Sequence, residues 1–212
     1  MVVYFNRLLL RAGRLACASA NLLLMELNEM KQQYLKAEVQ KEKAVQHIQE
    51  HLQNWLSKWL GGSKKLNTIE LVYLPYFIFP YRLESKSLKD GIRGYIGIES
   101  YEKHSVILPV DQETFELDPN LTILPAGEEI DAGFAYDIMY NEAFIKEKHR
   151  TRGTIRLQVD EPFLLYVPYW IGYLKGTKTE IMAVDGLSGN IDFKMKDPIL
   201  KAFLKEAGGV KA

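Results

Sequence analysis

Two kinds of hydrophobic pattern divide the chain. From about Asn21 to Leu60, apolar residues recur every three or four positions among Glu, Lys and Gln, and no Pro or Gly interrupts them. This spacing places the apolar side chains on one face of a helix. At 1.5 Å per residue such a helix would be about 60 Å long, so we expect it to pair in a coiled coil or a helical hairpin. Gly61 and Gly62 are expected to end it.

After these glycines the pattern changes to short runs rich in Tyr, Phe, Ile and Val, which are typical of strands. Leu71–Ile78 reads LVYLPYFI, and Leu164–Ile171 reads LLYVPYWI, with five of eight residues identical. We interpret this as an internal duplication, in which two copies of one strand unit bury a shared apolar face. Pro75 and Pro168 occupy the same place in each copy, which predicts a bent strand or an edge strand there.

The predicted fold is α+β. Residues 1–62 are expected to form the long amphipathic, coiled-coil-like helix, which serves self-association or docking. Residues 63–212 are expected to form a β-rich globular domain of two related antiparallel strand units, at about 66–110 and 154–197, with short helices. Ala135–His149 and Asp197–Ala207 are compatible with such helices.

A hairpin motif lies in the second copy. Ile181–Ile191 reads as strand, turn and strand around Asp185–Gly189, and Asp-Gly between apolar runs predicts a hairpin. The segment resembles the hairpin of PepSY-type repeats, small bacterial modules whose strand ends in a V-D-x-x-[ST]-G-like turn. The first copy has Glu99–Lys103 at this place, without the glycines, so neither the family nor a function is assigned from the resemblance.

The net charge of zero is the sum of segments with opposite charge. Residues 1–25 contain three Arg and no acid, whereas residues 111–145 contain nine acids and neither Lys nor Arg. We expect such blocks to pair within the fold or to lie on a solvated face. Because the chain has no overall excess of basic residues, nucleic acid is not an expected partner.

The first segment leaves a membrane role open. Arg7, Arg11 and Arg14 lie at i, i+4 and i+7, so a peripheral membrane protein anchored by this helix is one alternative. The favoured interpretation is a packed helix whose arginines meet acidic residues. Cys17 is the only cysteine, which excludes an intrachain disulfide and favours a reducing compartment. The expected location is a bacterial-type cytoplasm.

The most specific chemical motif is His47-Ile48-Gln49-Glu50-His51, the H-x-x-E-H pattern of inverted zinc metallopeptidases. On a helix, His47 and His51 could bind Zn²⁺ with Glu128 as third ligand, and Glu50 could act as general base. A zinc-dependent hydrolase is therefore the enzymatic alternative. Because Ile48 belongs to the apolar stripe, a solvated helix face is the favoured interpretation, and no catalytic residue, metal or other cofactor is expected.

Aromatic residues of the repeated strands are the remaining candidates for a ligand or partner surface. Successive residues of a strand face opposite sides, so some aromatic surface is expected at an interface. Paired aromatic residues also commonly fill a core, and that is the favoured interpretation of these side chains. The sequence thus predicts a non-enzymatic interaction or scaffold protein, a homo-oligomer through its N-terminal helix, with a second surface for a protein or peptide. The residues of that aromatic surface are Tyr73, Tyr76, Phe77, Tyr166, Tyr169 and Trp170.

Overall fold

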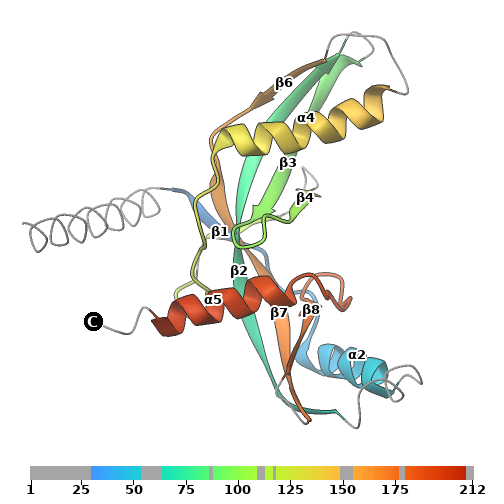
Figure 1. Cartoon of the computed structure of the whole chain (residues 1–212), viewed down its shortest axis with the longest axis vertical. Helices are drawn as coiled ribbons and strands as arrows, with labels where there is room; N and C mark the ends of the chain where they lie inside the picture. Colours follow the sequence, from blue (N-terminus) through green and yellow to red (C-terminus); the bar gives the residue numbers. More distant parts are fainter. Residues whose placement is uncertain are drawn as a thin grey trace, which may run out of the picture. The chain divides into compact units, whose positions relative to one another are not determined.

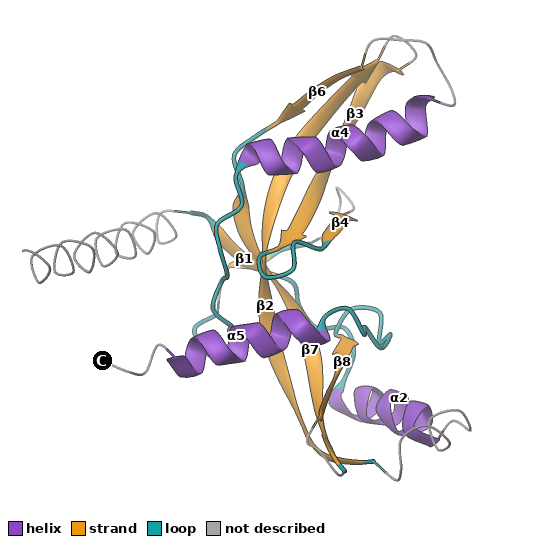
Figure 2. Cartoon of the chain, in the orientation of Figure 1, coloured by secondary structure: helices purple, strands orange, loops and turns teal. Residues whose placement is uncertain are grey.

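The computed structural model describes residues 30–53, 64–85, 88–108, 113–116, 118–148, 155–176 and 180–208. Nearly all of them belong to one compact unit, Gln32–Ala212. Within this unit the described residues form a mostly β, α+β fold, in which eight strands make one sheet and three helices accompany it (Figures 1 and 2).

The centre of the sheet is the antiparallel pair of β2 (Lys65–Ser85) and β7 (Phe163–Lys175). The two copies of the repeated octapeptide pair with each other here. Leu74 lies opposite Val167, its own counterpart in the repeat. A local two-fold axis therefore passes through this pair, and the duplication appears in the structure as two halves of one continuous sheet.

The other strands extend the sheet on both sides of this pair. The strand order is β4-β3-β2-β7-β1-β5, with β6 beside β2 and β8 beside β7. All pairs of these strands are antiparallel except β1 with β7, which is parallel. The remaining strands are β1 (Gln32–Tyr34), β3 (Leu88–Glu99), β4 (Ser105–Leu108), β5 (Phe115–Glu116), β6 (Ile155–Val159) and β8 (Glu180–Asp185).

Pro75 and Pro168 lie within the two central strands, where a missing N–H is usually costly. In both strands, however, the outer neighbour changes close to the proline. On β7 it changes from β1, which pairs as far as Tyr166, to β8, which begins to pair at Tyr169. On β2 it changes from a bridge at Tyr73 to β3, which pairs from Tyr76 onward. Each proline thus lies at a gap between two outer neighbours, while it stays in register with the other central strand.

One helix covers the middle of the sheet. This helix, α5 (Lys196–Gly208), crosses β2 and β7 near the two-fold axis (Figure 2). Its buried Ile199 and Ala202 belong to the same core cluster as Leu74 and Val167. The C-terminal segment therefore closes the apolar face that the two copies share.

The other two helices occupy equivalent places in the two copies. Helix α2 (Lys41–Gln53) buries Ala44 and Ile48, spaced i and i+4, in a core cluster with residues of β2, β7 and β8. Helix α4 (Ala132–Lys148) contacts β6 and β3. Each helix follows a short segment that is parallel to the long strand of the other copy: β1 beside β7, and residues 122–124 beside β2 at Tyr73.

The predicted long N-terminal helix is wrong. Its expected range contains β1 and a connecting segment, and the described helix spans only Lys41–Gln53. The main chain of the connection bonds elsewhere: Leu35 N–H donates to Tyr166 O at 3.0 Å, and Val39 N–H donates to Gly186 O at 2.9 Å. Residues 1–29 and 54–63 lie outside the described residues. Because β1 is a strand of the sheet and α2 packs against it, the compact unit begins at Gln32, before the expected boundary at residue 62.

Candidate functional site

The structure places the predicted aromatic surface in the core. Tyr73, Tyr76, Phe77, Tyr166 and Tyr169 are between 0% and 7% exposed. The sixth residue, Trp170, is partly buried and donates its indole N–H to Val39 O at 2.8 Å. These side chains therefore hold the two copies together.

The two-fold axis brings two of these tyrosines together. The hydroxyl oxygens of Tyr76 and Tyr169 lie 3.1 Å apart, and the Tyr76 hydroxyl also donates to Met195 Sδ at 3.2 Å. Burial is the main reason that the pKa of each hydroxyl is raised. Both therefore stay protonated as hydrogen-bonding groups inside the core.

The residues of the H-x-x-E-H motif attach α2 to the second copy. His47 Nδ1 lies 2.5 Å from Gly189 O, and the His51 ring lies against the Phe193 ring with centroids 5.4 Å apart. Glu50 accepts a hydrogen bond from Gln46, while Glu128 lies exposed in the loop before α4. Within the described parts of the chain, no group of three or more His, Cys, Asp or Glu side chains could hold a metal ion.

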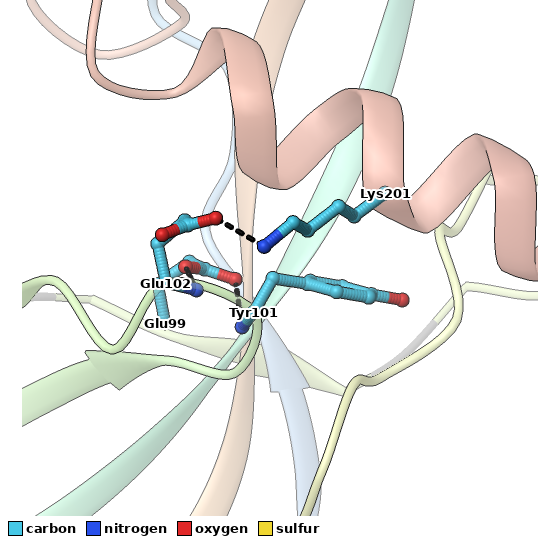
Figure 3. Close-up of polar contacts among 4 residues, drawn as sticks. All are labelled: Glu99, Tyr101, Glu102 and Lys201. Atoms are coloured by element: carbon cyan, nitrogen blue, oxygen red, sulfur yellow. Dashed lines mark hydrogen bonds and ion pairs between the residues drawn. The ribbon is translucent and has the colours of Figure 1, made fainter.

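The turn after β8 and the turn after β3 are the same structure. Asp185 lies opposite Tyr169, and Glu99 lies opposite Tyr76, its counterpart in the repeat. In each turn the carboxylate accepts two main-chain N–H groups, at 2.8 and 3.3 Å for Asp185 and at 2.5 and 2.8 Å for Glu99 (Figure 3). Each turn also contains a residue in the left-handed region: Gly189 in the second copy, with a φ of 78°, and Lys103 in the first copy, with a φ of 59°. The shared element is thus the carboxylate rather than the glycines.

In the described part of the chain, an ion pair joins the turn of the first copy to α5. Glu102 pairs with Lys201 of that helix, as Figure 3 shows. The Tyr101 hydroxyl donates to Pro125 O at 2.6 Å, which ties the turn to the loop before α4. His104 follows in the same turn, and its Nδ1 is buried without a hydrogen-bond partner among the described residues.

Two neighbouring carboxyl groups of this turn have pKa values shifted in opposite directions. Glu99 is 0% exposed, and burial raises its pKa, although bonds from two main-chain N–H groups and the nearby His104 act against the shift. Lys201 lowers the pKa of the exposed Glu102. The turn therefore contains one carboxyl group that folding makes harder to ionise and one that folding makes easier to ionise.

We expect Glu99→Gln to change how stability depends on pH. The folded protein binds a proton at Glu99 more tightly than the unfolded chain does. The ionisation of Glu99 therefore lowers the free energy of unfolding as pH rises from the unfolded pKa through the raised folded pKa. Urea unfolding across this range should show that loss in the original protein but not in Glu99→Gln.

The control is Glu102→Gln, three residues after Glu99 in the same turn (Figure 3). The lowered pKa of Glu102 means that its contribution to stability is present above the unfolded pKa and is lost as pH falls through the folded pKa. The two variants should therefore differ from the original protein with opposite signs of pH dependence. Equal pH profiles for both variants would contradict the assignment.

A different feature is exposed on the molecular surface: the edge strand β4. Among the described residues it pairs only with β3 (Figure 1). Val106 is 43% exposed and Ile107 is 42% exposed. A sheet edge offers unpaired main-chain groups to another strand, and β4 adds apolar side chains to them.

The ladder determines which main-chain groups of β4 point outward. Glu99 N–H donates to His104 O at 2.9 Å, so His104 directs its main-chain groups toward β3. Inward and outward groups alternate along a strand in an antiparallel pair. Val106 therefore also bonds inward, whereas Ser105 and Ile107 present their N–H and C=O groups at the open edge.

The second copy provides an internal comparison for this edge. Ile191 bridges β8 at the position where Ser105 pairs with β3. The next three residues are Asp192–Lys194 in the second copy and Val106–Leu108 in the first. Charged side chains are a common protection of sheet edges against unwanted pairing. The second copy has an Asp and a Lys there, while the first copy has only apolar residues.

Smaller apolar groups are exposed on two helices. On α5 they are Leu200 and Leu204, which are 38% and 72% exposed. On α4 the rings of Tyr136 and Tyr140 stack with centroids 5.8 Å apart. Neither pair has the unpaired main-chain groups that distinguish β4, because a helix satisfies these groups internally.

No protein-family model, curated protein or solved structure matches this chain. The likeness of its second hairpin to PepSY-type repeats therefore assigns no family. None of the helices among the described residues is long and apolar enough to cross a membrane. The predicted membrane anchor, with Arg7, Arg11 and Arg14, lies outside the described residues.

Proposed function

We propose that this chain is a non-enzymatic interaction protein that binds an extended protein segment by strand addition at β4. The observation that carries the proposal is the open edge itself, with outward main-chain groups at Ser105 and Ile107 and exposed side chains at Val106 and Ile107. In strand addition, main-chain hydrogen bonds provide affinity, and alternate side chains provide specificity. Because the exposed side chains of β4 are those of Val106 and Ile107, we expect the bound segment to contain apolar or β-branched residues.

The arrangement of the other polar groups supports a binding role over catalysis. The carboxylates of Glu99 and Asp185 bond to the main chain of their own turns, and His47 contacts Gly189 O. Because these groups have structural partners, they are poorly placed to act on a substrate. A cytoplasmic location is part of the same proposal, since a chain with Cys17 as its only cysteine cannot form an internal disulfide.

The proposal can be tested by selecting peptides from a displayed random library on the full-length protein. We expect extended, β-branched sequences to be enriched. Their affinity should fall by about tenfold or more in Val106→Asp, which gives β4 the residue found at the equivalent position of the second copy. A charge at this edge repels an apolar strand but leaves the inward bonds to β3 intact.

Leu204→Lys is the matched control, because it also replaces an exposed apolar residue with a charged one, on α5. It should leave peptide binding unchanged. Selected peptides that bind Val106→Asp as well as the original protein would overturn the proposal, and so would a selection that enriches no peptides. Circular dichroism should confirm that both variants are folded.

A further inference from the structure

We infer that the physiological partner of β4 is β4 of a second copy of this chain, paired antiparallel about a two-fold axis at Val106. The inference rests on the proposed function, since it names the segment that strand addition captures. The pairing would join the sheets of two chains edge to edge. It differs from the coiled-coil association predicted from the sequence, because it uses no residue of the first helix.

The chemistry of β4 suits pairing with itself. Ser105–Leu108 contains no charged residue, so antiparallel self-pairing places no like charges opposite each other. A two-fold interface uses the same surface on both partners, which must therefore be self-complementary. By contrast, the equivalent edge of the second copy contains an Asp and a Lys, and it continues through Met195 into α5.

The outward main-chain groups select the register. When the axis passes at Val106, Ser105 lies opposite Ile107 of the second copy, and Ile107 lies opposite Ser105 of the second copy. Each such pair exchanges two hydrogen bonds, so the outward N–H and C=O groups of both residues are all satisfied. A register centred on Ile107 would leave Ser105 opposite no residue of β4, which ends at Leu108.

The side chains agree with this register. Val106 would lie opposite Val106 of the second copy in a non-hydrogen-bonded pair, where the Cα atoms approach to about 4.5 Å. Burying these two half-exposed valines removes apolar surface from water. Because the contact is a short strand, with an area typical of transient complexes, we expect dissociation constants on the order of micromolar or weaker.

Sedimentation velocity of the full-length chain under reducing conditions measures the association. We expect the average mass to rise from monomer toward dimer over the micromolar range. Val106→Asp should remain monomeric, while Leu204→Lys should associate like the original protein. A chain that stays monomeric at all these concentrations, or a dimer that Val106→Asp does not weaken, would overturn the inference.

Disulfide trapping tests the register. In a Cys17→Ser background, Val106→Cys should form a covalent dimer on mild oxidation, because its expected Cα separation of about 4.5 Å lies in the disulfide range of about 4.4–6.8 Å. Ile107 is equally exposed, but in this register it lies opposite Ser105 of the second copy. The two thiols of an Ile107→Cys dimer would therefore be two residues apart along the strands, and this variant should remain monomeric. Preferential cross-linking of Ile107→Cys, or equal cross-linking of both, would overturn the Val106 axis.

These outcomes can be separated from a failure of the proposed function. Peptide selection does not require self-pairing. If the chain is monomeric and Val106→Cys does not cross-link, while selected peptides still bind in a manner that Val106→Asp abolishes, then only the second-copy inference fails. Failure of the peptide selection as well would remove β4 as an interaction site altogether.

Discussion

Replacing Phe77 with alanine is expected to lower the free energy of unfolding by about 3–5 kcal/mol. Phe77 is 0% exposed and lies in β2, opposite Leu164 of β7 on one side and Ile98 of β3 on the other. Both neighbours belong to strands that are hydrogen-bonded to β2, so they cannot move inward to fill the space. The cost is therefore both the lost burial of the ring and the cavity that remains. Urea unfolding followed by circular dichroism would measure the loss.

Phe193→Ala is the control for this prediction, because it makes the same chemical change at a residue that is 65% exposed. Surface substitutions usually change stability by less than about 0.5 kcal/mol. Phe193→Ala also loses the ring contact with His51, and we still expect it to cost far less stability than Phe77→Ala. If the two variants lost similar amounts of stability, the packing of Phe77 at the centre of the sheet would be wrong.

Gly127→Ala is expected to destabilise the protein by about 1–3 kcal/mol, as other overpacked sites do. A Cβ atom at this buried position would lie 2.6 Å from the carbonyl oxygen of Ser100, which is main chain and cannot rotate away. The N–H of Gly127 also donates to Ser100 Oγ at 2.8 Å, so separating the two segments would break that bond. The predicted effect is a lower urea midpoint with an unchanged slope.

The glycine control is Gly208→Ala at the end of α5, where an added Cβ would meet nothing within 4 Å. We expect at most a small change there. A Gly127→Ala variant as stable as Gly208→Ala would show that the loop before α4 can move away from the first-copy turn.

Some parts of the fold can be predicted from sequence because they depend on local patterns. The repeated octapeptide identifies the two central strands, and the helix predictions for Ala135–His149 and Asp197–Ala207 agree closely with α4 and α5. The expected helix over residues 21–60 fails for a tertiary reason. Apolar residues of β1, the connection and α2 follow one another with helix-like spacing. The main-chain bonds of β1 and the connection, however, go to β7 and to the turn after β8, so the helix begins only at Lys41.

The candidate site depends on information that one sequence does not contain. Ser105–Leu108 has the composition of a buried strand, and its open side becomes visible only when its pairing is known. The equivalence of the Glu99 and Asp185 turns is hidden for a similar reason. The two turns share few residue types, although they are held by the same two main-chain bonds.

In each copy, a short segment pairs in parallel with the long strand of the other copy, and this exchange affects how the protein folds. β1 pairs with β7, which lies far from it in the sequence, and residues 122–124 pair with β2 at Tyr73. The hairpins β2–β3 and β7–β8 join neighbouring segments, but the central pair of β2 and β7 cannot form before distant segments meet. Such a topology has a high contact order, which slows folding because the entropy of long loops is lost before the contacts are gained. Until the second half of the chain emerges from the ribosome, β2 has no β7 to cover it, and its apolar residues remain exposed to other chains.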